Sequence, residues 1–182
     1  FKRTGKFLSI FLITASFLPI VEAKISLSKG DDIVLVGAGM GSRMIHYGHF
    51  ETEVYLTHAD LNLKIRNLCD EGNTPGFRPH PSRNQEEQYA FPGAKELIHE
   101  SLQAATKPKG HFPTPDQWLS DLHAEVVLCF FGFNSSFDGP RQADRFKKEL
   151  DAYIKHLNSM PFGQSTPQIA LISPTAVESV PG

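Results

Sequence analysis

Three short clusters rich in glycine, asparagine and serine interrupt this chain, and each one follows an apolar run. The clusters are residues 37–42 (GAGMGS), 67–74 (NLCDEGNT) and 131–136 (FGFNSS). Glycine lets a main-chain N–H approach a ligand closely, and asparagine adds a side-chain amide. Such donors can bind a phosphate or stabilise the negative charge that develops on an attacked carbonyl oxygen. The first cluster therefore raises a chemical question: whether its turn binds a phosphate, carries a reactive serine, or has no ligand.

Expected strands and helices, which must position these clusters, alternate along the chain. Four runs have the apolar, β-branched composition of strands, and they are residues 32–37 (DIVLVG), 61–68 (LNLKIRNL), 125–131 (EVVLCFF) and 168–173 (QIALIS). Residues 40–58 suit a helix. Asp138-Gly139-Pro140 predicts an N-cap and first turn for a second helix. Its expected apolar face consists of Phe146, Leu150, Tyr153, Ile154 and Leu157. This alternation predicts a parallel sheet with helices on both faces.

In such sheets ligands bind beyond the carboxyl ends of the strands, which is where all three clusters fall. A dinucleotide-binding motif needs a third glycine where Ser42 stands, and an acidic residue at the end of the second strand. The position about 20 residues on, near Asp60, precedes that strand. A nucleotide-binding domain is therefore only a distant alternative.

The second and third clusters resemble two sequence blocks of the SGNH hydrolases, also called the GDSL esterase/lipase family. The matching residues are 67–74 and Gly132-Phe133-Asn134. The resemblance implies a flavodoxin-like three-layer α/β/α fold with a central parallel sheet. It also implies that Gly72 and Asn134 donate to the oxyanion of an attacked ester. The resemblance covers most of residues 30–178, and the phrases GHFPTPDQWL and FFGFNSSFDGP resemble a subgroup of large secreted bacterial proteins that begin with such a domain.

The first cluster departs from the family pattern. Gly39 occupies the position of the family's nucleophilic serine, so it would contribute only its amide. Ser42, three residues further on, is either a relocated nucleophile or a helix-capping residue. Residues 135 and 136, both serines, are expected to bond locally to the backbone. The family's Asp-x-x-His block is not found, and we expect a catalytic histidine, where the parent protein has one, beyond Gly182. Residues 24–182 would then be an incomplete SGNH-like domain within a longer protein that has further domains.

Residues 74–118 form a long connection with several prolines. One short helix is expected within it, at residues 94–105. A connection of this length is a binding loop or lid, or else an insertion without a role in binding.

Composition limits the class of protein. The chain has 182 residues, 40% hydrophobic and 21% charged, with a net charge of −2. These values are typical of a globular domain and indicate no nucleic-acid partner. Residues 1–23 carry three basic residues, then an apolar run, then Val-Glu-Ala, which is the layout of a signal peptide. We therefore predict a secreted or periplasmic protein without a membrane span in its mature chain.

Two cysteines cannot form a disulfide framework, although a bridge between Cys69 and Cys129 remains possible in an oxidising compartment. Cys129 is expected to be a buried small hydrophobe. His46 and His49 have no Cys or carboxylate pattern nearby, so we assign no metal and no cofactor.

Two functional hypotheses follow from Gly39, Ser42, Gly72 and Asn134. In the first, the protein is an exported hydrolase of a small-molecule or carbohydrate ester, with an unusual nucleophile. In the second, it is a degenerate SGNH-like domain that binds a glycan or a partner without turnover. An Asp-x-x-His block after Gly182 would favour the enzyme.

Overall fold

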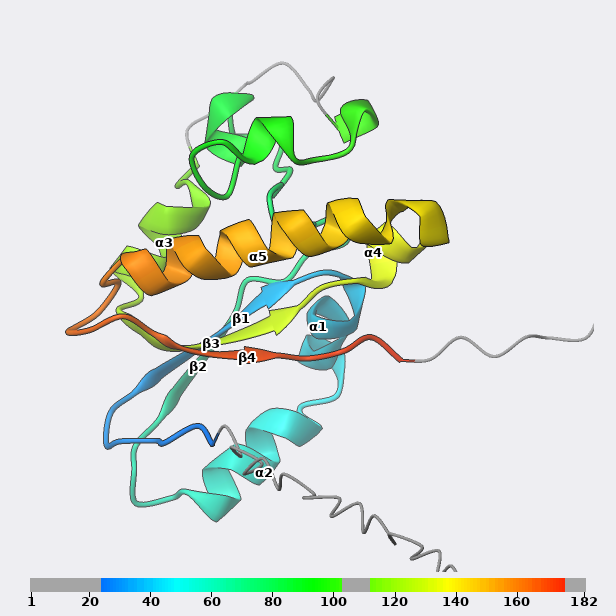
Figure 1. The fold of residues 1–182 in the computed structure, drawn as a ribbon. Helices are drawn as coiled ribbons and strands as arrows, with labels where there is room; N and C mark the ends of the chain where they lie inside the picture. Colours follow the sequence, from blue (N-terminus) through cyan, green and yellow to red (C-terminus); the bar gives the residue numbers. More distant parts are fainter. Residues whose placement is uncertain (1–23, 103–111, 176–182) are drawn as a thin grey trace, which may run out of the picture.

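Four parallel strands form the centre of the molecule (Figure 1). The structure is a computed structural model that describes residues 24–102 and 112–175, so the predicted signal peptide at 1–23 lies outside the described residues. The strands are β1 (Asp32–Gly37), β2 (Lys64–Asn67), β3 (Ala124–Phe130) and β4 (Gln168–Leu171). They lie in the order β2-β1-β3-β4, and every neighbouring pair is parallel. The predicted parallel sheet is confirmed.

Two strands are shorter than the sequence pattern suggested. The second was expected to begin at residue 61, but Asn62 has a φ of 49° and turns the chain, so β2 begins at Lys64. The fourth was expected to reach residue 173 and ends at Leu171. The Ile172 N–H still donates to the Cys129 carbonyl at 2.9 Å.

The single helix expected over residues 40–58 is wrong. The chain forms α1 (Gly39–Arg43), a 3-10 turn (Met44–His46) and α2 (His49–Thr57). Gly48 separates them with a φ of 63°, a left-handed conformation that ends a right-handed helix and that glycine adopts without strain.

Three further helices follow the second strand: α3 (Pro115–Asp121), α4 (Phe133–Ser136) and α5 (Ala143–Ser159). Thr114 and Gln117 form a reciprocal capping box that starts α3. A 3-10 turn (Pro140–Gln142) leads into α5, with the proline in the first turn as predicted. Asp138 does not cap this helix, because its carboxylate pairs with Arg145 instead.

Helices cover both faces of the sheet because β1 and β3 are apolar on both sides. Val34, Val36, Val127 and Cys129 face a buried cluster that includes residues of α3, α5 and the irregular segment. The alternate positions of the two strands pack against residues of α1 and α2 and against residues 25 and 27. Successive side chains of a strand point to opposite faces, which produces two separate cores from one run of apolar residues. None of the described helices is long and apolar enough to cross a membrane.

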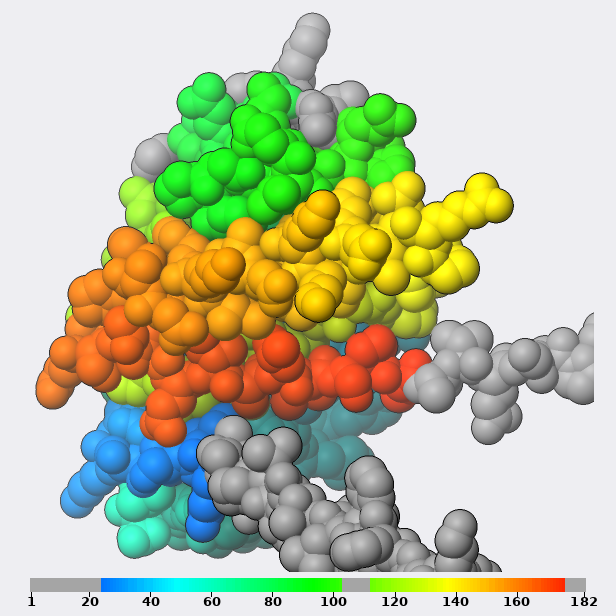
Figure 2. Space-filling model, in the orientation of Figure 1, coloured from blue at the N-terminus to red at the C-terminus, as the bar shows by residue number. Residues whose placement is uncertain are grey.

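The irregular segment between β2 and α3 packs against α5 (Figure 2). Its described part contains short 3-10 turns at Glu86–Gln88, Ala94–Glu96 and Glu100–Leu102, so the helix expected over residues 94–105 is wrong up to residue 102. Residues 103–105 lie outside the described residues. Phe77, Phe91 and Ile98 are buried, so this part of the segment belongs to the folded core.

Gly37 is the position at which we expect a single methyl group to be most disruptive. A Cβ atom there would lie 2.3 Å from the Phe130 carbonyl oxygen, and the φ of 138° disfavours any side chain. We expect Gly37→Ala to lower the free energy of unfolding by more than about 4 kcal/mol in denaturant titration. Gly30→Ala is the matched control, because its φ of 89° is also positive but its Cβ would meet nothing within 4 Å. It should cost about 1–2 kcal/mol. Equal losses in the two variants would show that the close approach to Phe130 contributes nothing.

Candidate functional site

The structure brings the three clusters together at the carboxyl edge of the sheet. Gly39, Gly72 and Asn134, each from a different cluster, line one pocket of about 440 Å³. We call it the glycine pocket, and its remaining lining residues are Met40, Arg43, Glu71, Phe133 and Thr175. The expected convergence of Gly39, Gly72 and Asn134 is therefore observed. Ser42 does not line the pocket.

The first turn is shaped by close contacts with its neighbours. The Ala38 N–H donates to the Phe130 carbonyl at 2.9 Å, so the chain leaves β1 against the end of β3. Gly41 is buried, and a Cβ atom there would lie 2.3 Å from the Cys69 sulfur. Glycines at 37 and 41 thus permit packing that a larger residue would block.

Two asparagines fasten the loop after β2 to this turn. Asn67 donates from Nδ2 to the Gly41 carbonyl at 2.8 Å and accepts from the Cys69 N–H at 2.9 Å. Asn73 is buried and donates from Nδ2 to the Gly37 carbonyl at 3.0 Å. Their amides are therefore structural, and they set the position of Gly72 between them.

Gly72 and Asn134 retain hydrogen-bond donors for a ligand. Gly72 is exposed with a φ of 87°, and its N–H has no partner among the described residues. The Asn134 Nδ2 donates to the Asn73 carbonyl at 3.2 Å. A primary amide carries two N–H groups, so this bond leaves one of them unused.

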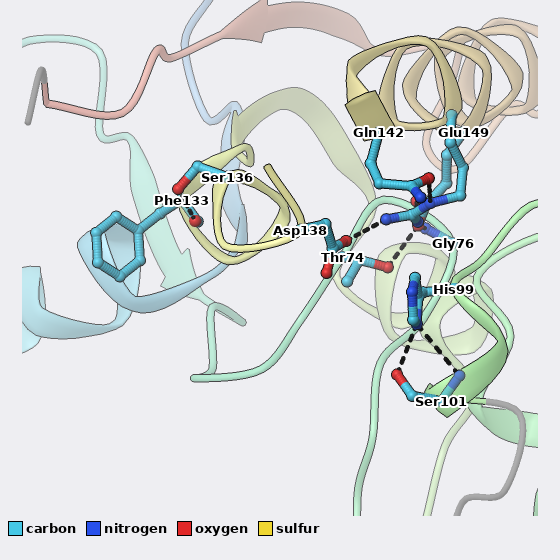
Figure 3. Close-up of polar contacts among 10 residues, drawn as sticks. Thr74, Gly76, His99, Ser101, Phe133, Ser136, Asp138, Gln142 and Glu149 are labelled. Carbon is cyan, nitrogen blue, oxygen red and sulfur yellow. Dashed lines mark hydrogen bonds and ion pairs between the residues drawn. The ribbon is translucent and has the colours of Figure 1, made fainter. Parts of the chain in front are cut away.

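Gly39, which the sequence places where a nucleophile was expected, has open space beside it but no side chain. Gly39 does not have a positive φ, and a Cβ atom there would meet only the Glu71 side chain, at 3.9 Å. Ser42 donates from Oγ to the Gly39 carbonyl at 3.1 Å. It does not cap the helix, because Ala38 is the N-cap residue, so the expected capping role is wrong. Ser136 bonds locally to the Phe133 carbonyl at 2.6 Å, as expected (Figure 3).

Charged and hydroxyl groups lie at the rim of the glycine pocket. Arg43 Nη2 lies 3.6 Å from Glu71 Oε1, and both side chains are exposed. An exposed pair of this kind adds little to stability, so both groups can interact with a ligand. Thr175 supplies the hydroxyl group among the described lining residues.

A buried carboxylate that the sequence analysis did not single out anchors the segment after Gly72. Figure 3 shows Glu149 pointing from α5 toward Thr74 and Gly76, and its Oε1 accepts from the Thr74 hydroxyl and from the Gly76 N–H. Glu149 is fully buried, and its Oε2 lies 3.6 Å from Arg145 Nη1. Glu149 is three residues after Phe146 and four before Tyr153, so it falls on the expected apolar face of the helix. That position is the sequence signal for its burial.

A second cavity is lined in part by other residues of the loop after β2, Asp70 and Asn73. It has a volume of about 230 Å³ and includes two buried arginines, Arg78 and Arg83, with aromatic walls from Phe112, Trp118 and Tyr153. We call it the arginine cavity. These arginines lie in the proline-rich stretch FRPHPSRN, whose composition indicated a turn and gave no sign of their burial.

A histidine–aspartate pair lies away from the glycine pocket. His156 Nε2 is 2.9 Å from each carboxylate oxygen of Asp116. His156 is near the C-terminal end of α5, whereas α4, which carries Asn134, is near its N-terminal end (Figure 1). A helix of 17 residues is roughly 25 Å long, so this pair does not reach the glycine pocket.

The cysteines form no bridge. Cys69 and Cys129 are both free, and burial raises the pKa of each thiol to about 12. Both are therefore protonated and unreactive at neutral pH. Within residues 24–102 and 112–175, no group of three His, Cys, Asp or Glu side chains is placed to bind a metal ion.

Comparison with protein-family models, with characterised proteins and with solved structures finds no match for this chain.

The Glu149 contacts generate a stability prediction. Glu149→Ala leaves the Thr74 hydroxyl and the Gly76 N–H buried without their acceptor. We expect the free energy of unfolding to fall by about 3–5 kcal/mol, and the Gly76 amide to exchange with solvent much faster. Asp151→Ala, on the exposed face of the same helix, is the control and should change stability by less than about 0.5 kcal/mol. A loss in Glu149→Ala no larger than in the control would contradict the anchoring role.

Proposed function

We propose that this chain is an SGNH-like domain of an exported protein and that its glycine pocket binds the carbonyl group of an ester. The observation that carries the proposal is the convergence of Gly39, Gly72 and Asn134 on one pocket, although they are far apart in sequence. The free Gly72 N–H and the unused Asn134 N–H are donors of the kind that a carbonyl oxygen accepts. An acylated carbohydrate is the proposed ligand class.

The fold supports the same proposal. The strand order β2-β1-β3-β4 matches the first four strands of the flavodoxin-like order. The pocket lies beyond the carboxyl ends of β1 and β3, where ligands of such sheets bind.

Binding without turnover is the activity that we favour. Gly39 leaves the nucleophile position without a hydroxyl, and the described lining residues of the glycine pocket include no serine and no histidine. A hydrolase is the second candidate, because Thr175 brings a hydroxyl to the pocket and the donors for an oxyanion are retained.

Binding is tested by NMR titration of the protein with an acetylated xylo-oligosaccharide. We expect the signals of the Gly72 N–H and of the Asn134 side-chain amide to shift, and the deacetylated oligosaccharide to shift them less. Asn134→Asp keeps the shape but replaces the donor by an acceptor, and should weaken binding roughly tenfold. Ser135→Ala, next to it but outside the pocket lining, is the control. Equal shifts with both oligosaccharides would contradict recognition of the ester.

Turnover is tested with a fluorophosphonate probe that labels activated hydroxyl nucleophiles. We expect the protein to resist labelling and to release no acetate from the same oligosaccharide. Labelling that disappears in Ser42→Ala or in Thr175→Val would identify that residue as a nucleophile and would establish the hydrolase. Gly39→Ser should fold normally, because the Cβ position is open, and it would gain labelling only where a base reaches the new hydroxyl.

A further inference from the structure

The segment of residues 78–83 is folded so that two arginines face the same cavity. The Arg78 N–H donates to the Gln88 carbonyl at 2.8 Å, and the Arg83 N–H donates to the His80 carbonyl at 3.0 Å. The Arg78 carbonyl in turn accepts from Arg83 Nη1 at 2.9 Å. These bonds close a compact turn whose two cationic side chains both line the arginine cavity.

Both arginines are buried without a carboxylate partner. Arg78 is 5% exposed and Arg83 is 7% exposed. Neither forms an ion pair with any acidic group of the described residues. Asp70 lines the cavity but is exposed, and the Glu87 carboxylate, which acts on Arg83, accepts from the Asn84 N–H. Arginine is almost never fully buried unless its charge is paired, so this arrangement lacks a counter-charge.

The electrostatic effect of the two charges is visible on Arg83. Its pKa is lowered to about 10, mainly by burial and also by the charge of Arg78, while Glu87 acts in the opposite direction. A bound anion would relieve both the burial and the mutual repulsion.

Both guanidinium groups have several contacts, and that of Arg78 keeps an unused donor. Arg78 lies over the rings of Phe131, at 4.6 Å, and Tyr153, at 5.0 Å. Its Nη1 donates to the Phe77 carbonyl at 3.3 Å, and its buried Nη2 has no partner among the described residues. Arg83 donates from Nε to the Pro113 carbonyl at 2.7 Å. Nη2 of Arg78 is therefore a buried donor without a partner among the described residues, on a side chain that lines the cavity.

The remaining walls suit an organic ligand. Phe112 stacks on His80 with 3.7 Å between ring centroids and lies under the Arg83 guanidinium at 5.0 Å. Trp118 packs against Phe112, at 5.7 Å between centroids. The volume of about 230 Å³ equals roughly eight water molecules, which is enough for one small ring with a charged substituent.

We propose that the arginine cavity is an anion-binding subsite that accepts a carboxylate, sulfate or phosphate group carried by a small cyclic organic ligand. The guanidinium groups of Arg78 and Arg83 bind the charged oxygens, and the aromatic walls contact the ring. On the loop after β2, Asp70 and Asn73 of the arginine cavity flank Glu71 and Gly72 of the glycine pocket. The subsite does not depend on the proposed ester-binding function, because it is a different cavity.

The test is calorimetric titration of the full chain with four sugars of similar size: glucuronate, glucose 6-sulfate, glucose 6-phosphate and uncharged glucose. We expect at least one anionic sugar to bind at least tenfold more tightly than glucose, and the order among the three to identify the preferred group. In NMR spectra the Arg78 and Arg83 Nε–H signals should shift on addition of that sugar, whereas the Arg43 signal should not.

Variants separate the cavity from other basic positions. Arg78→Met and Arg83→Met should each weaken binding of the anionic sugar at least tenfold, and Arg141→Met, an exposed arginine, should leave it unchanged. The proposal is overturned when no anionic sugar binds more tightly than glucose. It is also overturned when binding shifts the Arg43 signal while the Arg78 and Arg83 signals stay in place. The NMR result on the unmodified chain decides the question even where a Met variant does not fold.

Discussion

The close approach of Gly37 to the backbone of Phe130 is the constraint on which the rest of the site depends. It joins the end of β1 to the end of β3, with the Ala38 N–H bonded to the Phe130 carbonyl. The Gly37 carbonyl then accepts from the Asp70 N–H and from the Asn73 side chain, which fixes the loop after β2. One residue without a side chain thus holds three segments together at one edge of the sheet. Both cavities are built on that junction.

The loop after β2 separates two environments of different chemistry. Its Gly72 side opens on a pocket with neutral N–H donors and an exposed Arg43–Glu71 pair. Its Asn73 side borders a cavity in which buried arginines have no acidic partner among the described residues. Opposite charges are therefore paired on the Gly72 side, whereas the buried arginines on the Asn73 side form no ion pair with the described residues. A ligand group that suits one side is a poor match for the other, so the two sites would select different chemical groups.

Buried polar contacts, in addition to apolar packing, hold the irregular segment to the core. Glu149 accepts the hydrogen bonds that water would otherwise accept from the Thr74 hydroxyl and the Gly76 N–H. The other buried residues of its helix are Tyr153 and Leu157. Breaking such a contact leaves polar groups unsatisfied in a dry interior, which is more costly than the contact itself is favourable. The position of the segment, and with it the wall of the arginine cavity, is consequently tied to α5.

Local sequence patterns by themselves determined the strand at residues 32–37 and the parallel α/β arrangement. They also determined the edge of the sheet at which Gly39, Gly72 and Asn134 meet, because periodicity and chain order dictate which strand ends lie together. The tertiary structure decided what depends on contacts between distant residues. Gly48 divides a helix that the sequence pattern predicted to be continuous, because it adopts a left-handed φ of 63°. Arg78 looks like an ordinary surface residue in the sequence, and Glu149 differs from one only by its place on the apolar face of its helix. They are buried because segments far along the chain enclose them, and burial is the property that turns a common charged side chain into a binding group or an anchor.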